Sequence, residues 1–277
     1  MKIFNFYPVI LSLLISGCQT VKTTTEGKVG IDRTQRMMVS AEAIEESASI
    51  QYSKLMLKLK KLGKLNVDKI QTQRVKNITK RLIKQTTIFR EDAPGWDWEI
   101  NVLKSPRINA WCMPGGKIAV YSGLINKIKA TDDELAAVIG HEIAHALREH
   151  SRERASERVL ADIGISVLTS VAKIGRLGRT SMVYAYQGLV GLPNSRKHEI
   201  EADRIGIELS ARAGFDPRAA ISFWKKIGKL GKEEPPKFLS THPSRDDRVN
   251  DLTFYSDKVM DLYFKSKEGW VKFKNPN

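Results

Sequence analysis

Residues 134–153, ELAAVIGHEIAHALREHSRE, decide the fold. The stretch is an apolar run with helical character, and it places His141 and His145 four residues apart with Glu142 between them. Side chains four apart on an α-helix point about 40° from each other, so both imidazoles can reach one metal ion. The capping box of Thr131 and Glu134 predicts that this helix starts at about residue 132.

The H-E-x-x-H spacing is typical of hydrolytic zinc sites. Glu142 projects beside the histidine pair, where it can take a proton from a metal-bound water. A catalytic zinc needs a third protein ligand and an open position. The metzincin pattern is excluded because Arg148 and Ser151 stand where it requires glycine and histidine, and His150 points away if the helix continues.

A second helix offers the third ligand. In HEIEADRIG, residues 198–206, Glu199 and Asp203 lie four apart on one face. Glu199 would complete a set of two histidines and one carboxylate, and Asp203 would accept the free ring N–H of a ligating histidine. An ordinary charged helix face remains an alternative at this point.

The rest of the pattern predicts an α+β, mainly helical domain with a small sheet beside the H-E-x-x-H helix. Apolar residues recur at helical spacing over 44–62 and 70–82, whereas residues 96–102 alternate as in a half-buried strand. Residues 107–125, RINAWCMPGGKIAVYSGLI, hold two apolar runs around a turn. The apolar stretch from residue 159 to 175 is too short to span a bilayer and is expected to be a buried helix or a mobile flap.

The N-terminus has the layout of an exported lipoprotein. Residues 1–17 resemble a signal peptide, and ISGC resembles the lipobox that makes Cys18 a lipid-anchored mature N-terminus. Gln19 then implies sorting to the outer membrane, by resemblance to bacterial lipoproteins. Residues 18–36 are predicted as a tether and residues 37–277 as the catalytic domain. Cys112 is left without a disulfide partner.

Composition and net charge limit the classes of molecule that this protein is expected to bind. The 277 residues are 42% hydrophobic, which is ample for a packed core, and carry a net charge of +15. Export excludes nucleic acid, so the basic surface either contacts anionic lipid headgroups or is simply solvated.

These motifs together resemble one zinc metallopeptidase family, which includes the CAAX prenyl proteases, HtpX, the mitochondrial overlapping-activity protease and periplasmic BepA. The resemblance rests on HEIAHALREHSRER and SRKHEIEADRIG, and extends over INAWCMPGGKIAVYSGLI, DRTQRMMVS and LSTHPSRDDRV, roughly residues 32–252. It implies one Zn²⁺ held by His141, His145 and Glu199, with Glu142 as the catalytic base and Asp203 behind a histidine.

The resemblance also implies two further parts of the site. The strand containing Gly116, Lys117, Ile118 and Ala119 would be an edge that pairs with the substrate backbone, although its apolar pattern equally suits an internal strand. His242, in the T-H-P loop, would lie beside the metal. It would act either on the oxyanion or as a fourth ligand that keeps the enzyme latent; a histidine that only bonds its own loop is the remaining alternative.

The sequence differs from members of this family in two features. HtpX and the prenyl proteases have transmembrane helices, BepA has a repeat domain, and neither has a counterpart in this sequence. We therefore expect a minimal endopeptidase, lipid-anchored at the periplasmic face of the outer membrane, that degrades misassembled or damaged envelope proteins and contacts the outer-membrane protein assembly machinery. The alternatives are a non-catalytic, chaperone-like lipoprotein and a purely structural zinc site.

Overall fold

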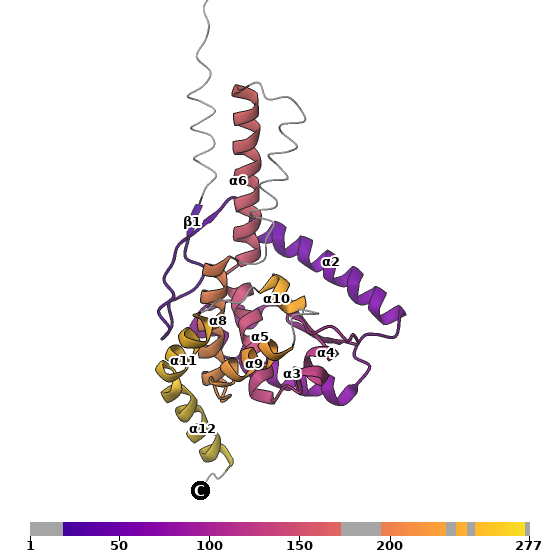
Figure 1. The fold of residues 1–277 in the computed structure, drawn as a ribbon, viewed down its shortest axis with the longest axis vertical. Helices are drawn as coiled ribbons and strands as arrows, with labels where there is room; N and C mark the ends of the chain where they lie inside the picture. Colours follow the sequence, from indigo (N-terminus) through magenta and orange to yellow (C-terminus); the bar gives the residue numbers. More distant parts are fainter. Residues whose placement is uncertain (1–18, 173–194, 231–236, 243–246, 275–277) are drawn as a thin grey trace, which may run out of the picture.

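The computed structural model describes residues 19–172, 195–230, 237–242 and 247–274 (Figure 1). Two helices, α5 (Asp132–Leu147) and α8 (Arg196–Arg212), lie side by side at the centre. The predicted start of α5 is confirmed, and the capping box of Thr131 and Glu134 is formed in both directions. The fold class is the predicted one, a mainly helical α+β domain.

The remaining helices surround this central pair. The core is filled from α3 and α9 as well as from the sheet, with Leu82, Phe223 and Ile118 almost fully buried. The surrounding helices are α2 (Ala41–Lys61), α3 (Lys69–Ile83), α4 (Ser122–Ile128), α6 (His150–Val171), α9 (Ala219–Lys229), α10 (Lys237–Thr241), α11 (Arg248–Lys258) and α12 (Met260–Lys274), with 3-10 turns η1 (Thr86–Ile88) and η2 (Ala93–Gly95).

The small sheet lies against α5 and contains β3 (Glu99–Leu103), β4 (Ala110–Met113) and β5 (Lys117–Tyr121). Its order is β3-β5-β4, with β5 parallel to β3 and antiparallel to β4. The interpretation of residues 116–119 as a substrate-binding edge is therefore wrong, because β5 is the central strand and both its sides are paired. Among the described strands, β4 is the edge strand that contacts α5, and it is paired only with β5.

The N-terminal segment is packed rather than extended. β1 (Gln19–Val21) pairs antiparallel with β2 (Gln35–Met37), and β2 lies against α6. Val29 and Gln35 are fully or almost fully buried. The prediction of an open tether is thus wrong from Gln19 onward, because apolar and buried polar side chains fix this segment to the domain. Residues 1–17 and Cys18 lie outside the described residues.

Helix α6 projects beyond the body of the domain (Figure 1). Of the two forms expected for residues 159–175, the buried helix is wrong for the outer part of α6, since Val167 and Leu168 are about half exposed, at 54% and 51%. Residues 173–175 of that stretch lie outside the described residues. Within the described ranges, no helix is both long enough and apolar enough to cross a bilayer.

Candidate metal centre and active site

Two glycines bring the motif-bearing helices into contact. Gly140 on α5 faces Gly206 on α8, and a Cβ added to Gly206 would come within 2.7 Å of the backbone nitrogen of His141. A side chain at either position would force the helices apart. The close crossing places the histidines of α5 directly against the carboxylates of α8.

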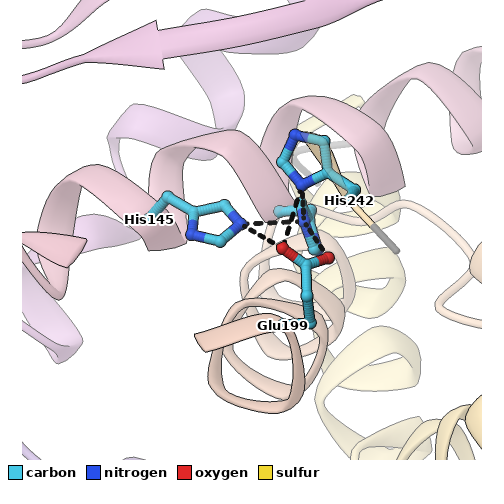
Figure 2. A group of neighbouring side chains, drawn as sticks. His145, Glu199 and His242 are labelled. Carbon is cyan, nitrogen blue, oxygen red and sulfur yellow. Dashed lines mark hydrogen bonds and ion pairs between the residues drawn. The ribbon is translucent and has the colours of Figure 1, made fainter. Parts of the chain in front are cut away.

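Four buried side chains converge at this crossing. The Nε2 atoms of His141 and His145 are 3.0 Å apart, and His242 Nδ1 lies 3.1 Å from His141 Nε2. Figure 2 shows the carboxylate of Glu199 between His145 and His242, with Oε1 3.3 Å from His145 Nε2 and 3.1 Å from His242 Nδ1. His242, which follows α10, is thus part of the cluster, so it does more than bond its own loop.

The spacing of these atoms fits a tetrahedral ion. Ligands about 2.05 Å from a zinc ion lie about 3.3 Å from one another, and the contacts here range from 3.0 to 3.4 Å. One atom from each of the four residues lies within 4.8 Å of every other, and all four residues are buried. Imidazoles and a carboxylate form a donor set that zinc accepts.

The charges of the cluster depend on one another. Burial lowers the pKa of His141, but Glu199 and Asp203 raise it more, so it reaches about 9. Burial holds the pKa of His145 well below its ordinary value. For Glu199, burial raises the pKa, but the surrounding histidines lower it to well below its ordinary range. A metal ion bound here would replace the proton on His141.

Behind His141 stands the predicted carboxylate. Asp203 Oδ1 is 3.0 Å from His141 Nδ1, which leaves Nε2 facing the cluster. Asp203 also accepts a 2.6 Å hydrogen bond from Arg248, whose second contact is Glu199 Oε2 at 3.3 Å. Arg248 is buried and stacks on Trp224, 3.4 Å from the ring centroid. Sequence reasoning missed this arginine, although it stands in the matched stretch LSTHPSRDDRV.

His150 lies closer to the site than the sequence suggested. The helix does not continue: α5 ends at Leu147, Glu149 adopts a left-handed conformation with φ of 49°, and α6 begins at His150. The change of direction returns His150 Nδ1 to within 2.7 Å of His145 Nδ1. The expectation that His150 points far from the histidine pair is therefore wrong, although His150 faces the outer side of His145 and is not one of the four residues that meet in the cluster.

Glu142 occupies the position expected of a base. It is 3% exposed, and within the described part of the chain its Oε1 accepts no hydrogen bond. His242 Nε2 lies 3.3 Å from that atom. Burial raises the pKa of Glu142, which brings the carboxyl closer to the range of a working base.

A cavity of about 560 Å³ opens over Glu142 and His145. Its walls come from α2, through Ala48 and Leu55, and from β4, through Trp111 and Met113. The edge of the sheet therefore borders the space next to the base. Cys112, a free thiol among the described residues, also lines this cavity.

Residues 69–255 match the model of peptidase family M48. The chain belongs to this family. It is 42% identical over 154 residues to the mitochondrial metalloendopeptidase OMA1 of Arabidopsis thaliana, covering 56% of this chain and 30% of that relative. The OMA1 protein of Saccharomyces cerevisiae is 26% identical over 268 residues, covering 92% and 76%.

A bacterial protein is also similar to this chain. The beta-barrel assembly-enhancing protease of Yersinia pestis is 29% identical over 196 residues, covering 66% of this chain and 38% of the relative. The chain thus spans well under half the length of the Arabidopsis and Yersinia proteins. Members of family M48 depend on a metal, and the cluster described above is where this chain would hold it.

Proposed function

We propose that this protein is a zinc-dependent endopeptidase. One observation carries the proposal. The buried carboxylate of Glu142 lies beside a cluster that could hold a metal ion, and both line the same cavity. His141, His145 and Glu199 would hold the ion. A bound zinc would supply Lewis acidity to the substrate carbonyl and lower the pKa of water toward about 7.

The residues of the chain perform the proton steps. Glu142 Oε1, which accepts no hydrogen bond from the described residues, accepts the proton of the attacking water and then delivers it to the leaving amine. The backbone N–H of Cys112 bonds the Glu142 carboxylate and so fixes it against β4. Asp203 holds the His141 ring with Nε2 inward.

The substrate would enter as an extended strand along β4. This strand has one side paired to β5, and it borders the cavity beside Glu142. An added strand gains main-chain hydrogen bonds that do not depend on side chains, which gives affinity with little sequence preference. The apolar walls formed by α2 and Trp111 suit the apolar segments that a misassembled protein exposes.

His242 would act as a fourth ligand that keeps the resting enzyme latent. Its Nδ1 lies as close to the cluster as the predicted ligands do, and its Nε2 lies beside the base. Catalysis needs an open coordination position. Turnover therefore requires His242 to move away and leave that position to water and substrate.

We place the enzyme at the periplasmic face of the outer membrane, anchored through Cys18 and acting on damaged or misassembled envelope proteins. The lipobox-like ISGC and the bacterial relative support this location. Replacing Cys18→Ser should release the protein from the membrane fraction. Continued anchoring of that variant would refute the lipoprotein assignment.

The activity is tested on the purified protein with casein and a flexible fluorogenic peptide. Hydrolysis should stop with a chelator and return with Zn²⁺, and Glu142→Gln should lower kcat by about 10²–10⁴-fold while zinc content stays at one ion per chain. Hydrolysis that persists in Glu142→Gln would contradict the mechanism. If the protein and its His242→Ala variant both keep casein from aggregating but hydrolyse neither casein nor the peptide, the chaperone-like alternative would be favoured.

A further inference from the structure

We propose that His150 is a positioning residue for the metal centre: it accepts a hydrogen bond from the outer nitrogen of His145 and thereby sets the tautomer that presents Nε2 inward. This inference rests on the zinc centre proposed above. The two ring nitrogens of His145 face different neighbours. Nε2 lies 3.0 Å from His141 Nε2, whereas Nδ1 lies 2.7 Å from His150 Nδ1.

The proton positions follow from the far end of this chain of contacts. His150 Nε2 lies 2.9 Å from Glu201 Oε2, and a carboxylate can only accept a hydrogen bond. The proton of His150 therefore sits on Nε2, which leaves Nδ1 as an acceptor. His145 must then carry its proton on Nδ1, and the lone pair of its Nε2 faces the cluster. The opposite tautomer of His150 would turn the lone pair of its Nε2 toward the Glu201 carboxylate, two acceptors at 2.9 Å with no proton between them.

Glu201 is held as a carboxylate. Its Oε2 accepts a 2.9 Å hydrogen bond from Arg148 Nε, and its Oε1 is bonded by Arg33 Nε. Arg148 is itself fully buried. The two arginines thus hold the Glu201 carboxylate, which accepts the hydrogen bond of His150, in one position.

The ring of His150 is also held in orientation. His198 stacks on it with ring centroids 4.3 Å apart and an angle of 25° between the planes. The left-handed Glu149 is what brings His150 to this place, because on a continued helix a residue five positions on would point about 140° away from His145. The ring of His150 is therefore held in one orientation by the stacked His198, the Glu201 carboxylate and the backbone turn at Glu149.

The test compares three variants at position 150 by zinc affinity, measured by competition with a chromophoric chelator. In His150→Asn, Oδ1 takes the place of Nδ1 and still accepts from His145, so most of the affinity should remain. In His150→Gln the polar group lies nearer to the place of Nε2 and meets Glu201 instead. Gln and Ala should therefore weaken zinc binding by about 10–100-fold.

Two additional readouts separate positioning from a packing role. The visible absorption of the Co²⁺-loaded protein should change in the Gln and Ala variants but not in Asn. Thermal unfolding of the metal-free proteins should be alike for Asn and Gln, because both bury one amide. If the Ala variant does not fold, the Asn and Gln pair still decides the question.

The outcomes are distinct. Equal zinc affinity in all variants and the unaltered protein would overturn the inference, and so would an Asn variant that is as weak as Gln. Loss of folding in both amide variants would show that His150 serves the core and would also overturn it. An unaltered protein that binds no zinc would instead refute the proposed function.

Discussion

His242 Nδ1 and Glu199 Oε1 lie 3.1 Å apart, so the residue that follows α10 meets the carboxylate of α8. This contact joins a residue far along the chain to the carboxylate of the metal centre, and Phe238 stacks on the same imidazole with centroids 4.5 Å apart. The imidazole is thereby held in the cluster, which makes its removal informative.

We expect His242→Ala to raise turnover of a flexible peptide, because the position it occupies becomes open to water and substrate. Zinc content should stay at one ion, since three ligands remain. The measurement is kcat on the fluorogenic peptide with metal analysis of the same sample. A fall of about a hundredfold, equal to about 3 kcal/mol, would instead assign His242 to the oxyanion. Unchanged turnover and zinc would remove it from the mechanism.

Glu199→Gln should reduce zinc affinity strongly, because it removes a charged ligand. The loss should exceed the roughly 10–100-fold that is typical when a residue that only hydrogen-bonds a ligand is replaced. Glu208→Gln is the matched control, since Glu208 lies on the same helix, is equally buried and bonds Val29 and Arg212 away from the cluster. Chelator competition measures both. A full zinc complement in Glu199→Gln would mean that the third ligand is another residue.

Gly206→Ala should destabilise the protein by about 1–3 kcal/mol and weaken zinc binding, because the new methyl group meets the backbone of His141. Gly228→Ala on α9 is the control. A Cβ there meets nothing within 4 Å, so that variant should be unchanged or slightly more stable. Denaturant unfolding of the two proteins checks the difference. Equal stabilities would show that the close crossing is not required.

Arg33→Met should lower the stability at pH 7 by about 2–3 kcal/mol, because Glu153 and Glu201 lose a shared cation. Burial raises the pKa of Glu153, but Arg33 and its other partners lower it far more, to well below 4.5. Stability from a depressed carboxyl pKa is complete above the unfolded value of 4.5 and is lost as the pH falls toward the folded value. The gap between the two proteins should therefore narrow between pH 5 and pH 3, as thermal unfolding over that range would reveal. A constant gap would contradict the pairing.

Local patterns identified much of this molecule. The capping box gave the start of α5 because it depends on residues three apart, and the four-residue spacings placed His141 with His145 and Glu199 with Asp203 because a helix fixes them. The combined motifs identified the family. The cluster itself also needed Gly140 and Gly206, whose meeting joins residues 66 positions apart.

Long-range choices lay beyond such patterns. β4 and β5 are both apolar, and only their neighbours decide that β5 is central, so the edge was assigned to the wrong strand. His150 was judged on the assumption of a continuous helix, and no glycine at position 149 signals the left-handed turn. Arg248 carries no periodic signal, because its role depends on charges that come from α8.

The pairing of β1 with β2 has a mechanical consequence. Gln19 lies opposite Met37, so the two strands meet at the end where the chain enters, while residues 22–34 close the other end. Tension applied ahead of Gln19 against the body of the domain would open this ladder one pair at a time, which takes less force than sliding both strands past each other. Arg33 precedes β2, and Gln35 on β2 lies opposite Val21; both side chains are bonded to Glu153. Under such a force, residues 19–21 would thus unpair from β2 before the buried ion pairs beside the metal centre are strained.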